Sequence, residues 1–169
     1  CYYAPPEQLK KLFNSIQIAF CELGRQYKVS NLPIYLIDNS EQVTPTNYEG
    51  LLTGYESNDS GLDIHYINGH GNIGYGRAHN LILNSLNSDF HLILNSDVII
   101  DKESLLNAIS VMNHDADVIG ISPHAENMLG EKQYLCKRYP SVFTLFIRGF
   151  SPETLKVNFS ERLFSYEKR

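Results

Sequence analysis

Apolar residues recur at spacings of three and four over residues 5–27, and this pattern predicts an amphipathic helix. Pro5 and Pro6 suit its first turn, where the backbone amide hydrogens have no partner within the helix. Gly24 is expected to loosen its other end. The residues expected to face the core are Leu9, Leu12, Phe13, Ile16, Phe20, Leu23 and Tyr27.

Short apolar runs rich in β-forming residues predict strands at residues 32–37 and 62–67. Residues 90–94 and 117–121 predict a third and a fourth strand. The stretch 41–60 is polar and has no clear period, so it is expected to be mostly irregular.

Two more helices are expected between and after these strands. Residues 77–86 predict one helix, and residues 102–113 predict another with Asp101 as its N-cap. The inward faces would be Ala78, Leu81, Ile82 and Leu86 in the first helix and Leu105, Leu106, Ile109 and Met112 in the second.

This alternation of strands and helices predicts an α/β fold, with a mainly parallel sheet and helices on both of its faces. Ligands of such sheets bind at the carboxyl ends of the strands. Polar clusters occur at two of these ends, Asp38-Asn39-Ser40 after the first strand and Asn95-Ser96-Asp97 after the third.

Composition and charge narrow the class of protein. The 169 residues are 43% hydrophobic and 20% charged, as in a soluble single domain. The net charge of −5 and the lack of any Lys or Arg run longer than two residues argue against nucleic acid as a partner. Cys1, Cys21 and Cys136 have no metal-ligand spacing, and they favour a reduced, cytoplasmic location.

No apolar stretch reaches the roughly 20 residues needed to span a membrane. Residues 140–150 are apolar with one Arg, which is typical of core packing. Peripheral association with the inner face of the cell membrane is the alternative for this segment.

The segment GHGNIGYG satisfies G-x-G-x-x-G through Gly69, Gly71 and Gly74, and it lies between a predicted strand and a predicted helix. This pattern is typical of dinucleotide binding, and Asp97 could serve as the ribose-binding acid. However, the fingerprint normally follows the first strand of its unit, whereas here a helix and a strand ending at Asp38 precede it. A turn that only lets strand and helix pack closely is a further alternative.

Three segments, taken together, resemble the motifs of a known family: Asp38-Asn39-Ser40, NIGYGRAHN at 72–80 and LILNSDV at 92–98. In order and spacing they resemble the family-2 glycosyltransferases, in particular bacterial members similar to rhamnosyltransferases of O-antigen and other cell-surface polysaccharides. The family pattern has a D-N-x-S turn, an N-x-G-x-G-x-A-x-N stretch and an L-N-P-D or D-x-D-like metal motif. The fold that this implies is the Rossmann-like GT-A fold of nucleotide-diphospho-sugar transferases.

The resemblance also implies roles for individual residues. Asp38 would accept a hydrogen bond from a pyrimidine imide, and Asp97 would bind Mg²⁺ or Mn²⁺ beside the diphosphate. Ser96 stands where the family has Pro. The donor nucleotide-sugar would be lined by Asp38, Asn39, Ser40, Asn72, Gly74, Gly76, Arg77, Asn80 and Asn95.

Plainer interpretations stay open beside these roles. Asp38 could form only a strand-end turn, Asp97 could be a turn carboxylate, and Arg77 could be a solvated charge on a helix face. His79 is expected to pack or to lie at the surface. The other histidines, His65, His70, His91, His114 and His124, have no metal-site spacing.

The resemblance further implies an inverting transfer of a sugar, with rhamnose as the first guess, to a polysaccharide or a lipid-linked acceptor. Inversion needs a carboxylate as general base, and no motif identifies one, although Glu153, Glu161 and Glu167 are available. We expect the base to lie outside a chain that looks truncated at both ends.

Residues 1–125 would form the donor-binding core of a single domain, and 126–169 would begin the acceptor side. The alternatives to a transferase are a nicotinamide-dependent oxidoreductase and a non-catalytic sugar-nucleotide-binding module.

Overall fold

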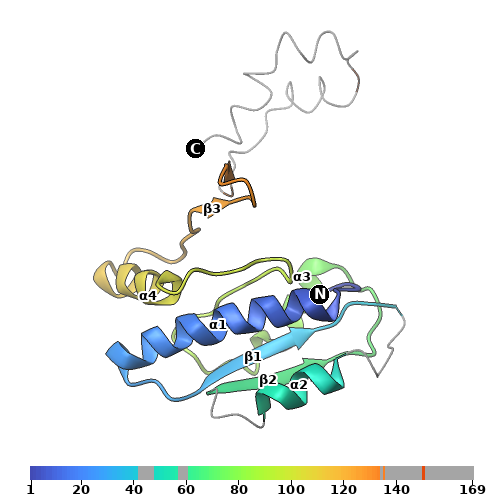
Figure 1. The fold of residues 1–169 in the computed structure, drawn as a ribbon. Helices are drawn as coiled ribbons and strands as arrows, with labels where there is room; N and C mark the ends of the chain where they lie inside the picture. The colour runs from blue at the N-terminus through green and yellow to red at the C-terminus, as the bar shows by residue number, and fades with distance from the viewer. Residues whose placement is uncertain (42–47, 57–60, 134, 136–149, 151–169) are drawn as a thin grey trace. The chain divides into compact units, whose positions relative to one another are not determined.

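The computed structural model describes residues 1–41, 48–56, 61–133, 135 and 150. It divides the chain into two compact units, 1–114 and 115–169. The first unit holds the helices and the parallel strands, and Figure 1 shows α1 lying along β1 and β2.

Helix α1 (Pro6–Tyr27) follows the predicted bounds to within one residue. Pro5 is its N-cap, and the chain leaves the helix at Lys28, whose backbone is left-handed and whose N–H donates to the Gly24 carbonyl. The predicted inward residues are buried except Tyr27, the last residue of the helix, which is exposed.

Strands β1 (Leu32–Ile37) and β2 (Leu62–Ile67) confirm the first two predicted strands. They pair in parallel, from Leu32 opposite Leu62 to Ile37 opposite Ile67, so both strands end at the same edge. Between them α2 (Glu49–Glu56) forms where an irregular stretch was expected. Its Leu52 and Tyr55 are buried in the same core as α1. This tertiary burial explains why a helix forms where the local sequence pattern does not predict one.

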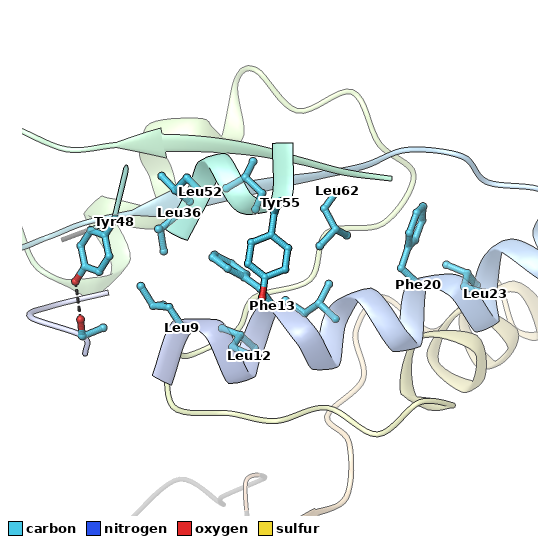
Figure 2. Packing of buried hydrophobic residues seen from close by; sticks show 13 residues of the cluster. Leu9, Leu12, Phe13, Phe20, Leu23, Leu36, Tyr48, Leu52, Tyr55 and Leu62 are labelled. Carbon is cyan, nitrogen blue, oxygen red and sulfur yellow. Dashed lines mark hydrogen bonds between the residues drawn. The ribbon is translucent and has the colours of Figure 1, made fainter. Parts of the chain in front are cut away.

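Side chains of the two strands alternate between two apolar clusters. Leu36 and Ile64 join the larger cluster with residues of α1 and α2, and Figure 2 shows Phe13 and Tyr55 side by side there. Ile37 joins the smaller cluster with Ala78 and Ile82 of α3 (Tyr75–Leu83). Helices therefore pack on both faces of the sheet, as predicted.

Helix α3 starts two residues earlier and ends three residues earlier than predicted. Ala78 and Ile82 are buried and Leu86 is partly buried, but Leu81 is exposed, because the contact with the strands uses only the narrow stripe of residues four apart. Helix α4 (Ser104–His114) begins after a turn in which the Glu103 N–H donates to the Asp101 carboxylate, at 2.9 Å. Three of its four predicted inward residues pack against the larger cluster, namely Leu105, Leu106 and Ile109.

The third and fourth predicted strands do not form. Residues 90–94 pair with no other strand that the structure describes, and Leu92 and Ile93 are more than half exposed. Apolar β-formers favour an extended backbone, but a strand also needs a neighbour for its hydrogen bonds. At 117–121 the chain instead turns, with the Asp117 and Val118 N–H groups donating to Asp115.

The second unit contains an antiparallel pair that the sequence did not predict, β3 (Ala125–Glu126) and β4 (Lys132–Gln133). The Asn127 amide holds the connection, since its oxygen accepts the N–H groups of Leu129 and Glu131, each at 2.9 Å. Apart from Phe150, the apolar segment 140–150 falls outside the described residues, as do Glu153, Glu161 and Glu167. Among the described helices, none is long and apolar enough to cross a membrane.

Substitution Phe13→Ala should lower the free energy of unfolding by about 3–5 kcal/mol, measured by urea denaturation. Phe13 is 1% exposed and packs edge-on against Tyr55, with ring centroids 5.4 Å apart, so truncation leaves a cavity. Ile18→Ala, at a position of the same helix that is 59% exposed, should change the free energy by no more than about 0.5 kcal/mol. Equal losses in the two variants would contradict this account of the core.

Candidate functional site

The end of β1 carries the first polar cluster, and all three of its side chains are buried. Asp38 is only 4% exposed, and its Oδ1 accepts the Ser40 hydroxyl at 2.6 Å and the Ser40 N–H at 3.1 Å. The Tyr66 hydroxyl donates to the other oxygen, Oδ2, at 2.9 Å. Asp38 thus forms the strand-end turn considered above, but the turn uses only one of its oxygens.

Asn39 connects this strand end with the glycine segment. Its Nδ2 donates to Asn72 Oδ1 at 3.0 Å, and its Oδ1 accepts the Ile73 N–H at 3.2 Å. Asn72 Oδ1 also accepts the Gly74 N–H at 3.1 Å. The first two sequence motifs are therefore in direct contact.

The glycine segment needs glycine at particular positions. Gly69, Gly71 and Gly74 have φ values of +85°, +64° and +85°, which side-chain-bearing residues rarely adopt. Gly74 is also the N-cap of α3. From there, α3 carries Gly76, Arg77 and Asn80 in its first two turns, with all three exposed.

The third motif lies next to the start of α3. The Tyr75 hydroxyl donates to Asn95 Oδ1 at 3.3 Å, and Gln8 Nε2 of α1 lies 3.5 Å from Ser96 Oγ. Asp97 follows in the same turn with an exposed side chain, and it accepts no hydrogen bond from any residue that the structure describes.

The side-chain oxygens of the third motif could hold a metal ion only together with oxygens from a bound ligand. The described part of the chain holds no group of three or more His, Cys, Asp or Glu side chains that could bind an ion by themselves. Asp97 and Asn95 supply one exposed carboxylate and one amide from a single turn. Mg²⁺ is commonly held by one or two carboxylates together with substrate phosphates, and this pair fits that arrangement.

Three tyrosines that the sequence did not predict as site residues contribute contacts to the site. Burial raises the pKa of Tyr66, and its hydrogen bond to Asp38 and the charge of that carboxylate raise it further, so the phenol stays protonated and donates. Tyr48 packs edge-on against Tyr66, and Tyr75 reaches Asn95. The alternation of β2 could have placed Tyr66 on the face of Leu62 and Ile64, but no local pattern indicates its hydrogen bond.

His79 is half-buried, with its ring edge-on to Tyr75 at a centroid distance of 4.5 Å. Burial lowers the pKa of His79, and the positive charges of the amino terminus and of His91 lower it further. A neutral ring that packs against a neighbour agrees with the expectation that His79 is a packing residue.

The comparison with family models decides which protein class this is. Residues 5–166 match the model described as Glycosyl transferase family 2. The chain belongs to this family. Searches of curated proteins and of solved structures give no match.

Membership of Glycosyl transferase family 2 supports glycosyltransferase activity, with a nucleotide-sugar donor and an acceptor as its partners. It also implies the GT-A α/β fold, of which the structure shows helices around a small parallel sheet. The family match gives no support to the nicotinamide-dependent alternative.

Gly74 and Gly76 differ in backbone conformation, so substitution by alanine should affect stability in opposite directions at the two positions. Gly74→Ala should lower the free energy of unfolding by about 1–3 kcal/mol, because a side chain at φ +85° is strained although no atom lies within 4 Å of the added carbon. Gly76→Ala, inside α3 and equally open, should instead raise it by about 0.5–1 kcal/mol. Thermal unfolding of both variants measures this, and destabilisation by Gly76→Ala alone would contradict it.

Proposed function

We propose that this chain binds a pyrimidine nucleotide diphospho-sugar as the donor part of an inverting, metal-assisted glycosyltransferase. The observation that carries the proposal is the continuous set of contacts joining the three motifs. Asn39 bonds to the glycine segment, and the first residue of α3 bonds to Asn95. These contacts connect the three motifs through the glycine segment and the start of α3, which supports a single shared site.

In this proposal Asp38 recognises the base. Its Oδ1 is occupied by the Ser40 turn, while Oδ2 accepts a bond from Tyr66 alone among the described residues and so has a second acceptor position to offer. A uracil or thymine imide N–H is a matching donor. Burial of the carboxylate would make such a bond stronger than one formed in water.

The ribose and diphosphate would lie over the glycine segment and the start of α3. Gly74 and Gly76 let the backbone come close to a ligand, while Asn72, Arg77 and Asn80 offer exposed polar groups. The amide groups at the first turn of a helix favour an anion, and the Arg77 charge adds to this preference. Arg77 would then bind the diphosphate rather than water alone.

Asp97 and Asn95 would hold Mg²⁺ or Mn²⁺ against the diphosphate. The ion would neutralise negative charge that grows on the leaving nucleoside diphosphate as the glycosidic bond to phosphate breaks. In an inverting transfer a carboxylate takes the acceptor's proton on the opposite face of the sugar, and no residue of this chain is assigned that role.

Rhamnose carried by dTDP is the sugar we propose, from the likeness of the three motifs to bacterial rhamnosyltransferases. The acceptor would be a growing polysaccharide or a lipid-linked glycan. A lipid-linked acceptor would place the protein at the inner face of the membrane, with the apolar segment 140–150 as the part that touches lipid.

Calorimetry of the 169-residue chain with UDP and dTDP, with and without Mn²⁺, tests the donor site. We expect saturable binding that Mn²⁺ strengthens. Asp97→Ala should weaken the Mn²⁺-dependent affinity by at least about tenfold, because it removes the only carboxylate proposed for the ion. Asp89→Ala, which removes another exposed carboxylate of the same connecting segment, should leave it unchanged. Failure of both nucleotides to bind, or equal affinities in the two variants, would remove the proposal.

A further inference from the structure

The carboxylate of Asp38 is held from two sides. On Oδ1 it accepts the Ser40 hydroxyl and N–H, with the Cys1 thiol 3.9 Å away, so this oxygen has no acceptor position left for a ligand. On Oδ2 it accepts only the Tyr66 hydroxyl among the described residues. Tyr66 therefore decides how much of Asp38 a ligand can use.

Tyr66 is itself fixed in place by its surroundings. It occupies the next-to-last position of β2 and packs against the larger apolar cluster. The Tyr48 ring meets it edge-on, with centroids 5.7 Å apart and planes at 73°. Tyr48 is anchored in turn, since its hydroxyl donates to the Ala4 carbonyl at 2.7 Å, as the dashed line in Figure 2 shows.

The bonds from Ser40 and Tyr66 limit both the number and the direction of the acceptor positions that the Asp38 carboxylate offers to a ligand. With Tyr66 bonded, Oδ2 presents one remaining lone pair, and the carboxylate cannot rotate without losing the bonds to Ser40 and Tyr66. Uracil and thymine present a single imide N–H donor at N3. Cytosine presents an acceptor at N3, next to a donor amine on C4.

We propose that Tyr66 is a positioning residue that makes Asp38 select uracil or thymine over cytosine, a role that rests on the proposed function. One fixed acceptor pairs with the imide N–H and faces the N3 lone pair of cytosine, which repels it. Without the Tyr66 hydroxyl, Oδ2 would have two open acceptor positions, although the Ser40 bonds would still hold Oδ1, and the cytosine amine could then use the second position. Loss of the hydroxyl should therefore relax selectivity, beyond weakening binding.

The test compares UDP and CDP binding by calorimetry in the presence of Mn²⁺. For the unaltered chain we expect UDP to bind about tenfold or more tightly than CDP, since an unmatched buried polar pair carries a large penalty. In Tyr66→Phe the UDP affinity should fall about tenfold and the UDP-to-CDP ratio should shrink to within about threefold. A purely structural role would lower both affinities together and leave the ratio unchanged.

Two other variants sharpen the comparison. Tyr55→Phe removes the hydroxyl of another tyrosine of the larger cluster, one that contacts Lys10 and Asn14 of α1, and it should keep the ratio of the unaltered chain. Asp38→Asn should abolish the ratio, and adding Tyr66→Phe to it should change the ratio no further, because the two residues act through one bond.

Should Tyr66→Phe fail to fold, Tyr66→Met also lacks the hydroxyl, and it fills irregular space readily. The same narrowed ratio is expected of it. The role of Tyr66 is overturned if a folded variant without the hydroxyl keeps the UDP-to-CDP ratio while Asp38→Asn loses selectivity. That result would not contradict the proposed donor site. Equal binding of UDP and CDP by the unaltered chain also overturns it. Absence of nucleotide binding overturns the proposed function and this inference together.

Discussion

The side-chain amide of Asn39 is the contact on which the arrangement of the site depends. It donates to Asn72 and accepts from the Ile73 N–H, so one residue joins the end of β1 to the loop that follows β2. Parallel pairing in register brings both strand ends to one edge, but it does not by itself fix the glycine loop there. An amide with a donor and an acceptor does so, because both of its bonds have defined directions.

Packing on the two faces of the sheet then carries this constraint to the rest of the unit. Ile37, the last residue of β1, lies in the cluster with Ala78 and Ile82. Helix α3 therefore packs against the end of β1, the same strand end that Asn39 connects to the loop. The opposite face of the strands is covered by α1 and α2. The start of α3 is thus fixed from its core side by apolar contacts and from the loop by hydrogen bonds, and its polar residues face outward.

The parts of the fold that the sequence predicts are those determined by local periodicity. Helix α1 and the two strands have a strong pattern of apolar positions, and their bounds follow from it. Residues 90–94 have the same composition as a strand, yet pairing depends on a neighbour far away in the sequence, which local pattern cannot supply. Helix α2 shows the reverse, because tertiary burial of Leu52 and Tyr55 stabilises a helix whose sequence does not indicate one.

The site shows the same division between local and non-local information. The positions of Asp38 and of the glycines follow from turn chemistry and strand ends, whereas the Tyr66 and Tyr48 contacts join residues 28 and 44 positions from their partners. This explains why a turn-forming and a ligand-binding Asp38 looked like alternatives in the sequence. In the structure the turn uses Oδ1, while Oδ2 accepts from Tyr66, so the turn leaves the second oxygen for the base contact that we propose. In the proposed donor site, the bonds that hold Asp38 for its own turn would also set the direction of its last acceptor, and this is the rigidity that discrimination between bases requires.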